Sequence, residues 1–357
     1  MIYFNRTAVI AIIIAATAFS LKCWRHRRRP IKDLRIPLIV ITGCDTGLGY
    51  STVVRYTNKN ISRKIAIIAL CLNEKQAKHL TDLFNNINLE AWSFDLRDSK
   101  SIKQTVTRIK SLIVSKNYKL HAVVNNAARM VMAEYEWQTI NLIQEQFQVN
   151  VLGPMEFTSG LLSTLRHDQG RVINVVSHCA LMPLPGIAIY GATKAAICAW
   201  TIGARAELSP EHGVKMIMFY PGSFYMNSSI MGSKKQREDY YDEILDGFSA
   251  ETLSYYGKHV LAYKNYLEVV NSYIRPKKEV IPNASLYKQL DHALWSEKPR
   301  AEYKVPVPLR YNIYSTLSWI SLIFGFHSLR DELIRRFVSM PSIILKEINI
   351  ENIQFQT

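Results

Sequence analysis

The stretch LIVITGCDTGLG, residues 38–49, carries the strongest structural signal in this chain of 357 residues. Its first part is continuously apolar and predicts a buried strand, and its three glycines follow where that strand ends. Glycine allows a sharp turn and a close approach of a ligand to the backbone, and the N-terminus of the next helix points free N–H groups at a phosphate. A glycine cluster by itself could be a simple turn. Its place between the first strand and the first helix predicts a cradle for a dinucleotide.

Apolar runs and amphipathic stretches alternate along the chain after Pro30. The predicted strands are 38–43, 65–72, 89–94, 120–126, 171–177 and 214–222, and the predicted helices are 47–58, 74–86, 99–115, 138–166 and 190–209. The strands are apolar almost throughout, as a parallel sheet covered on both faces requires. The alternation predicts an α/β fold with a single doubly wound parallel-sheet Rossmann domain, residues 34–310. Within that domain the polar, tyrosine-rich segment 223–300 predicts helices that cover one end of the sheet and the substrate.

Composition narrows the classes of function. The chain is 48% hydrophobic and 20% charged, which is typical of a globular protein with a full core. Its five cysteines have no zinc-site spacing and are expected to be free thiols. The net charge of +15 is partly local, because KCWRHRRR (22–29) carries five Lys and Arg residues. This run has no interleaved aromatic residues beyond Trp24, so we expect no nucleic-acid partner.

The N-terminal segment is expected to meet a membrane. TAVIAIIIAATAFSL (7–21) holds fifteen residues without a charge, and the basic run follows it. A cleaved signal peptide is the alternative, but signal peptides carry their positive charge before the apolar run. Charge on the C-terminal side favours an anchor over residues 1–30, with the bulk of the protein in the cytoplasm.

The C-terminal region is also apolar. YSTLSWISLIFGF (314–326) is too short to span a bilayer comfortably, and an amphipathic stretch follows it. A core helix and a helix lying on the membrane surface are equally compatible with this pattern. The helical C-terminal extension is placed at 311–340 as a membrane-associated segment, with a tail at 341–357.

Polar residues follow the predicted strands at one edge of the sheet. Asp95 closes the third strand, NNAA (125–128) closes the fourth, and Ser177 closes the fifth. Asp95 is either a helix cap or an adenine-side contact, and the asparagines could join neighbouring loops. In a doubly wound sheet these strand ends line the ligand crevice.

Two helical segments add further candidate residues. YGATK places Tyr190 and Lys194 four residues apart, which puts both side chains on one face of a helix. Asn150 lies within FQVNVLGP, where Gly153 and Pro154 predict a bend in a long helix.

Together these motifs resemble the short-chain dehydrogenase/reductase superfamily. TGCDTGLG, Asp95-Leu96, NNAA, the Asn150 helix, Ser177, YGATK and Pro221-Gly222 occur in its order and approximate spacing over roughly 36–337. TGCDTGLG, CLNEK (71–75) and KPRAEY (298–303) are similar to the branch that contains retinol dehydrogenases, type 2-like 17β-hydroxysteroid dehydrogenases and 3-hydroxybutyrate dehydrogenase.

The resemblance implies a catalytic set of four residues. Tyr190 would be the general acid/base, Lys194 would favour its phenolate and hold the nicotinamide ribose, Ser177 would bind the reacting oxygen, and Asn150 would position a proton-relaying water. The cofactor-binding residues implied are Thr42, Gly43, Asp45, Thr46, Gly47, Leu48, Gly49, Asp95, Leu96, Asn125, Ala127, Tyr190, Lys194, Pro221, Gly222 and Phe224. No metal is expected.

The expected cofactor is NAD, and the expected substrate is a lipophilic alcohol such as a steroid or retinoid. NAD is favoured over NADP because the glycine turn carries Asp45, which would repel a 2′-phosphate, and no basic residue. The resemblance implies a location on the endoplasmic reticulum, with the mitochondrion as the alternative, and leaves a homodimer open. Ala128 and Met226 depart from the family pattern. They keep open a second hypothesis, a catalytically silent NAD- or lipid-binding regulator with the same fold.

Overall fold

The computed structural model describes residues 33–57, 64–84, 88–222, 228–273 and 280–338. The chain divides into two units, Met1–Arg35 and Ile36–Thr357, and the account below concerns the second. The expected anchor at 1–30, the tail at 341–357 and the residues Phe224 and Met226 lie outside the described residues. Among the described helices none has both the length and the apolar composition that a membrane crossing needs.

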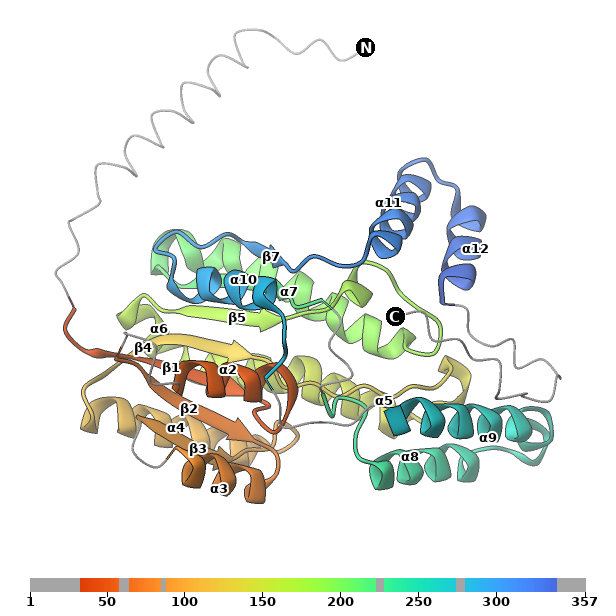
Figure 1. Ribbon diagram of the computed structural model, residues 1–357, viewed down its shortest axis with the longest axis horizontal. Helices are drawn as coiled ribbons and strands as arrows, with labels where there is room; N and C mark the ends of the chain where they lie inside the picture. The colour runs from red at the N-terminus through yellow and green to blue at the C-terminus, as the bar shows by residue number, and fades with distance from the viewer. Residues whose placement is uncertain (1–32, 58–63, 85–87, 223–227, 274–279, 339–357) are drawn as a thin grey trace, which may run out of the picture. The chain divides into compact units, whose positions relative to one another are not determined.

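The centre of the fold is a parallel sheet in the order β3-β2-β1-β4-β5-β6-β7 (Figure 1). Its strands are β1 (Ile36–Thr42), β2 (Ala66–Cys71), β3 (Leu89–Ser93), β4 (Tyr118–Asn125), β5 (Arg171–Val175), β6 (Lys215–Tyr220) and β7 (Glu302–Lys304). The six strands predicted from sequence are confirmed. β7 was not predicted, because three residues with only Tyr303 buried leave no apolar run to detect.

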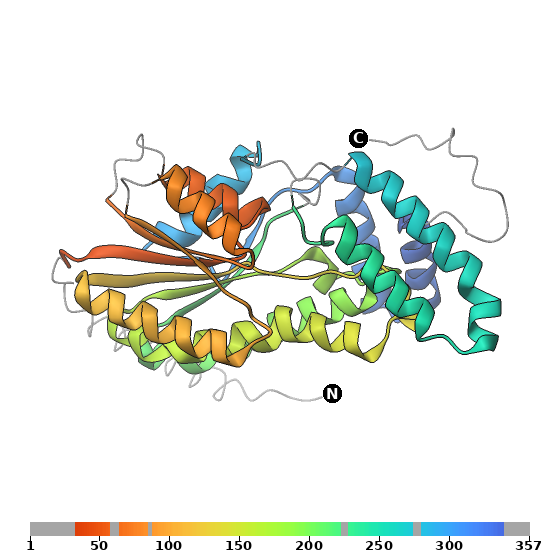
Figure 2. The ribbon, with the colours of Figure 1, turned by 90° about the horizontal axis from the view of Figure 1, so that it is seen from below.

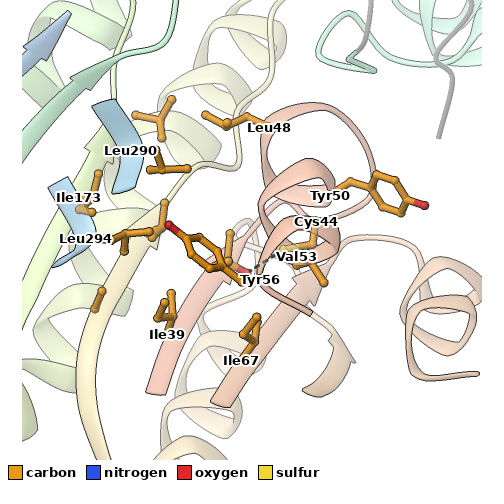
Figure 3. Packing of buried hydrophobic residues seen from close by; sticks show 14 of the residues in the cluster. Ile39, Cys44, Leu48, Tyr50, Val53, Tyr56, Ile67, Ile173, Leu290 and Leu294 are labelled. Carbon is orange, nitrogen blue, oxygen red and sulfur yellow. Dashed lines mark hydrogen bonds between the residues drawn. The ribbon is translucent and has the colours of Figure 1, made fainter. Parts of the chain in front are cut away.

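Helices cover both faces of the sheet (Figure 2). One face carries α2 (Gly47–Thr57), α3 (Glu74–Leu83) and α10 (Ala284–Trp295), and the other carries α4 (Ser99–Ser115), α6 (Gly153–Asp168) and α7 (Ala188–His212). Alternate side chains of β1 enter the two cores: Ile39 and Ile41 pack on the first side, Leu38 and Val40 on the second. Figure 3 shows the first core, where Val53 of α2 and Leu290 of α10 meet the sheet.

The predicted helix at 138–166 is interrupted, as its Gly-Pro pair indicated. α5 (Ile140–Phe147) passes into a five-residue π-helix, η2 (Gln148–Leu152), before α6 begins at Gly153. A π-turn holds one residue more than an α-turn, and such insertions often occur at functional sites. Asn150 lies at the centre of this insertion and is buried.

The segment predicted to cover the substrate is helical where it is described. α8 (Lys234–Asp246) and α9 (Ala250–Tyr273) precede α10. Arg237 of α8 pairs with Glu268 of α9 at 2.9 Å. The two helices share a separate aromatic core with Trp137, whose ring lies edge-on to that of Tyr263 at 5.7 Å.

At the opposite end of the sheet a half-buried histidine joins β4 to α10. The ring of His121 stacks on Trp295 with centroids 4.6 Å apart, and its Nε2 lies 2.6 Å from the Leu294 carbonyl oxygen. Burial lowers the pKa of His121 to about 4, and the nearby positive charge of Arg171 acts in the same direction. The folded chain therefore holds this imidazole neutral.

This depressed pKa predicts that stability falls in mild acid. The unfolded chain protonates His121 near pH 6.5 and the folded chain near pH 4. The contribution of neutral His121 to the free energy of unfolding is therefore present above pH 6.5 and is lost as the pH falls toward 4. We expect wild type to lose about 2–3 kcal/mol more over this interval than His121→Gln, measured by urea unfolding at a series of pH values. His212→Gln, at an exposed position, is the control and should keep the wild-type slope. Equal slopes for all three proteins would contradict the assignment.

Candidate active site

The glycine turn joins β1 to α2, and its three glycines have two different reasons to be glycine. Gly43 and Gly47 have φ angles of +69° and +60°, which side chains with a Cβ rarely adopt. Gly49 instead lies against the turn, where an added Cβ would be 2.3 Å from the carbonyl oxygen of Gly43. The turn is therefore a close-packed cradle that fits the phosphates of a dinucleotide at the N-terminus of α2.

One asparagine fixes this turn to the neighbouring strand. The side-chain amide of Asn126 donates to the carbonyl oxygens of Thr42 (2.9 Å) and Gly43 (3.0 Å). In return, the hydroxyl of Thr42 accepts from the backbone N–H groups of Asn126 and Ala127, both at 3.0 Å. This confirms that the pair in NNAA joins neighbouring loops. It also shows that Asn126, which was not among the predicted site residues, does so.

The first asparagine of the pair has a different environment. Asn125 is buried and donates to Asn174 of β5 (2.8 Å) and to Thr158 of α6 (3.0 Å), while Asn174 donates to Thr201 of α7 (2.8 Å). These bonds tie the sheet to the helices beneath it. The prediction that Asn125 contacts cofactor is therefore not supported for its side-chain N–H groups, which point into this network.

Asp45 joins the glycine turn to the loop that follows β2. Its carboxylate accepts from the backbone N–H groups of Leu72 and Asn73, both at 2.9 Å, just after β2 ends. The hydroxyl of Thr46 lies 2.8 Å from that of Ser229, which brings the segment after β6 onto the glycine turn. Leu48, also predicted at this site, has its side chain in the hydrophobic core.

Tyr190 and Lys194 are both buried on α7, with 7% and 3% of their surface exposed. The Lys194 Nζ lies 5.7 Å from the centre of the Tyr190 ring and donates to the carbonyl oxygen of Val175 at 3.0 Å. Val175 is the last residue of β5, so this bond holds the lysine at the carboxyl edge of the sheet. The pair is therefore not an ordinary helix surface.

Burial shifts the pKa values of the two groups in opposite directions. It raises the pKa of Tyr190, an effect that the nearby Cys179 increases and a hydrogen bond with Ser177 opposes. It lowers the pKa of Lys194 to about 8, against the influence of Cys198 and Cys179. The net shift of the Tyr190 pKa is thus upward, whereas a lowering by the lysine was expected. Cys179 belongs to this cluster and was missed, because a thiol two residues after a serine forms no motif.

Asn150 connects the π-helix to the same cluster. Its amide oxygen accepts from the backbone N–H of Arg129 at 2.8 Å, and its amide nitrogen donates to the Arg129 carbonyl oxygen (2.8 Å) and to the hydroxyl of Thr193 (3.0 Å). Thr193 lies inside YGATK. The structure therefore brings the four predicted catalytic residues to one edge of the sheet, although these bonds of Asn150 were not foreseen.

Asp95 is paired, which was not expected. Burial alone would raise the pKa of its carboxyl, but hydrogen bonds and charge from Arg97 lower it. Arg97 also reaches Glu145 at 2.8 Å, and Glu145 binds Arg129 at the same distance. The next residue, Leu96, has its carbonyl oxygen bound by Gln148 of the π-helix at 3.1 Å. The side chain of Asp95 is thus part of an ion-pair chain.

Gly222 follows Pro221 after β6 with a φ of +76°, and its Cα faces the side chain of Val305, which follows β7. This places the Pro-Gly turn at the same edge of the sheet as the glycine turn. Among the described residues no group of three or more His, Cys, Asp or Glu side chains could hold a metal ion.

A model of the short chain dehydrogenase family matches residues 37–239, which contain the glycine turn, the π-helix and YGATK. The chain belongs to this family. Its fold binds NAD or NADP, and the chain is an oxidoreductase that acts on CH–OH groups.

Relatives of this chain are named as dehydrogenases of estradiol and of retinol. The chain is 29% identical to rat estradiol 17-beta-dehydrogenase 2 over 269 residues, covering 74% of this chain and 67% of the relative. It is 30% identical to human retinol dehydrogenase 16 over 282 residues, covering 78% and 84%. A short-chain dehydrogenase from Streptomyces avermitilis has the same fold, with a TM-score of 0.58 at 18% identity over 84% of this chain and 98% of that one.

The clamp on the glycine turn gives a testable prediction. Asn126→Asp replaces two N–H donors with carboxylate oxygens that face the carbonyl oxygens of Thr42 and Gly43. We expect the dissociation constant for the dinucleotide, NAD or NADP, to rise at least about tenfold and the free energy of unfolding to fall by about 2 kcal/mol. Calorimetric titration and urea unfolding measure the two effects. Asn88→Asp makes the same change at an exposed position and should leave both values unchanged; an equal effect of the two substitutions would disprove the clamp.

Proposed function

We propose that this chain is an NAD-dependent dehydrogenase that oxidises a secondary or allylic alcohol on a steroid or retinoid. The observation that carries the proposal is the burial of Tyr190 and Lys194 together at the edge where the glycine turn lies. Thr42 ends β1 and Val175 ends β5, and parallel strands end at the same edge of a sheet. A nucleotide on the turn and an alcohol beside Tyr190 would therefore share one crevice.

The residues of the site have distinct tasks in this reaction. When bound, the nicotinamide supplies the hydride acceptor. The phenol oxygen of Tyr190 takes the proton of the alcohol, and Ser177 binds the alcohol oxygen. Protonated Lys194 stabilises the phenolate by its charge, while its bond to Val175 keeps the ammonium in place. The glycine turn, held by Asn126, orients the nucleotide.

The raised pKa of Tyr190 sets the direction of the pH dependence. The phenol stays protonated at neutral pH, so its action as a base becomes easier as the pH rises, while Lys194, with a pKa of about 8, keeps at least about half of its charge up to pH 8. We expect kcat/KM for alcohol oxidation to rise between pH 6 and 8 and that for ketone reduction not to rise. Initial rates of oxidation of estradiol and retinol, and of reduction of estrone and retinal, across this range check the profile.

Tyr190→Phe tests the proton transfer directly. Loss of the phenol oxygen should reduce kcat about 10³-fold, within the range for a general acid/base, and leave NAD binding in place. Tyr118→Phe is the matched control and should retain activity, because Tyr118 begins β4, at the end of that strand away from Asn125 and the glycine turn. Full turnover by Tyr190→Phe would refute the mechanism. Binding of NAD by wild type without turnover on any sterol or retinol would favour the silent regulator.

The preference for NAD is argued from Asp45. An NADP-binding loop offers donors to the 2′-phosphate, but here the N–H groups of Leu72 and Asn73 are already bound by a carboxylate. The negative charge of that carboxylate also repels a phosphate. Both effects favour a free ribose hydroxyl at this place, as NAD has.

Asp45→Ser should shift the cofactor preference. The substitution frees the two N–H groups and removes the charge, so we expect the kcat/KM ratio of NADP to NAD to rise at least about tenfold. Asp82→Ser, at an exposed position on α3, removes the same charge without freeing a donor and should leave the ratio unchanged. A wild-type enzyme that already prefers NADP would overturn the argument.

The proposal of a steroid or retinoid substrate is supported by the names of the relatives and by the aromatic composition of α8 and α9. α8 and α9 bring Tyr240, Tyr241 and Tyr263 into an apolar core beside Trp137, so the substrate side of the crevice is built on aromatic packing. Comparison of sterols and retinoids in cells with and without the gene would identify the alcohol that accumulates. We further propose an anchor at 1–30 in the endoplasmic reticulum membrane and, as a candidate assembly, a homodimer.

A further inference from the structure

The chain after β7 forms a helical hairpin with an unusual surface. α11 (Leu309–Ile323) and α12 (His327–Val338) pack on each other across a turn of three residues, 324–326 (Figure 1). Gly325 adopts a φ of +72°, and the rings of Phe324 and Phe326 on either side of it are stacked at 6.2 Å. We call Leu309–Val338 the C-terminal hairpin.

The burial pattern of α11 is the reverse of that of a helix in a soluble protein. Among its described side chains, Tyr314, Ser318 and Ser321 are buried, and two of these three are small and polar. The large apolar side chains point outward: Leu309 is 74% exposed and Trp319 is 63% exposed. The exposed apolar residues of the hairpin are Leu309, Ile313, Leu317, Trp319, Ile320, Leu322, Ile323, Phe324, Phe326 and Leu329.

The exposed apolar side chains surround most of the helix. At about 100° per residue, those of α11 cover an arc of about 220°, whereas the three buried residues cover about 60°. A helix or sheet of a partner protein covers one face of a helix, which is an arc of roughly 100°. An arc of more than half the circumference requires surroundings that can close around the helix, as lipid chains do.

Polar groups on the exposed arc are bonded within the helix and its N-terminal flank. The hydroxyl of Thr316 donates to the carbonyl oxygen of Asn312 at 2.9 Å. The side-chain amide of Asn312 donates to the carbonyl oxygen of Val307 at 3.3 Å. The buried Ser321 donates to Leu317 in the same way at 2.9 Å. In hydrocarbon a polar group must find its partner inside the protein, and small residues between helices are typical of packing in lipid.

We propose that the C-terminal hairpin docks on a lipid bilayer, with α11 lying in the surface layer and the Phe324–Phe326 turn inserted. With fifteen residues α11 is about 22 Å long, which is less than the hydrocarbon thickness of about 30 Å, so it lies in the surface rather than across it. Trp and Phe at the outer surface favour the headgroup boundary. α12 carries Arg330, Asp331 and Glu332, whereas the exposed side chains named above on α11 are apolar, and a surface-bound element needs both kinds of surface.

The hairpin is joined closely to the catalytic edge. α11 begins four residues after Val305, whose side chain faces Gly222 in the turn that follows β6. Docking of the hairpin would therefore hold this edge of the sheet near the bilayer. The inference does not depend on the substrate proposed above, since it rests on the surface of the hairpin alone.

Fluorescence quenching with the full chain in phosphatidylcholine vesicles tests the proposal. A dye is attached through Phe324→Cys at the turn or, as the matched control, through Tyr255→Cys, an exposed position on α9. Labelled wild type measures the background from natural cysteines. We expect spin-labelled lipid chains to quench the dye at 324 at least twofold and the dye at 255 hardly at all. Aqueous iodide should show the opposite order.

The remaining outcomes overturn the proposal. Quenching at 324 by iodide and not by lipid places the hairpin in water. Quenching by neither agent means that protein covers the turn, either a second copy or the apolar segment 7–21 of the same chain. If Phe324→Cys fails to reach the wild-type unfolding midpoint, Trp319→Cys on the same arc replaces it, with the same expected order.

Discussion

The crevice depends on one clamp, in which a single side-chain amide holds two adjacent carbonyl oxygens at the end of β1. Asn126 bonds Thr42 and Gly43, and the hydroxyl of Thr42 returns two bonds to the neighbouring strand end. The exchange fixes β1 and β4 against each other just where both strands have left the sheet. Gly49 can then pack on the Gly43 carbonyl, and the first turn of α2 is aimed at the crevice.

Tyr190 and Lys194 illustrate how burial acts on two titratable groups of opposite charge type. A buried phenol and a buried ammonium each resist ionisation, so the pKa of Tyr190 rises while that of Lys194 falls to about 8. The two values nearly coincide in the free side chains, so burial moves them apart, and the phenol holds its proton more tightly than the ammonium does. The carbonyl of Val175 holds the ammonium in place, which limits how far the lysine can move in response.

The sequence predicted the sheet well, because strands buried on both faces must be mostly apolar, and six of them are. It did not predict β7, whose single buried residue, Tyr303, leaves no pattern. Within the site, residue types were predicted better than their contacts. Asn125 and Asn126 are chemically identical neighbours, and only the alternation of a strand decides which one faces the glycine turn. Asp95 was expected to be either a helix cap or an adenine-side contact, but its pairing with Arg97 depends on side-chain rotamers, which sequence spacing does not record.

The π-helix at Gln148–Leu152 has a consequence for what changes of length this chain can accept. One additional residue in the turn shifts the phase between α5 and α6 by about 100°. Deleting any one residue there would restore a regular α-helix and rotate one half against the other. Asn150 would turn away from Thr193, or Gly153 would lose its fit against Leu96. Substitutions along this segment keep the phase between α5 and α6, whereas an insertion or a deletion changes it. The number of residues is therefore fixed by the contacts at both ends.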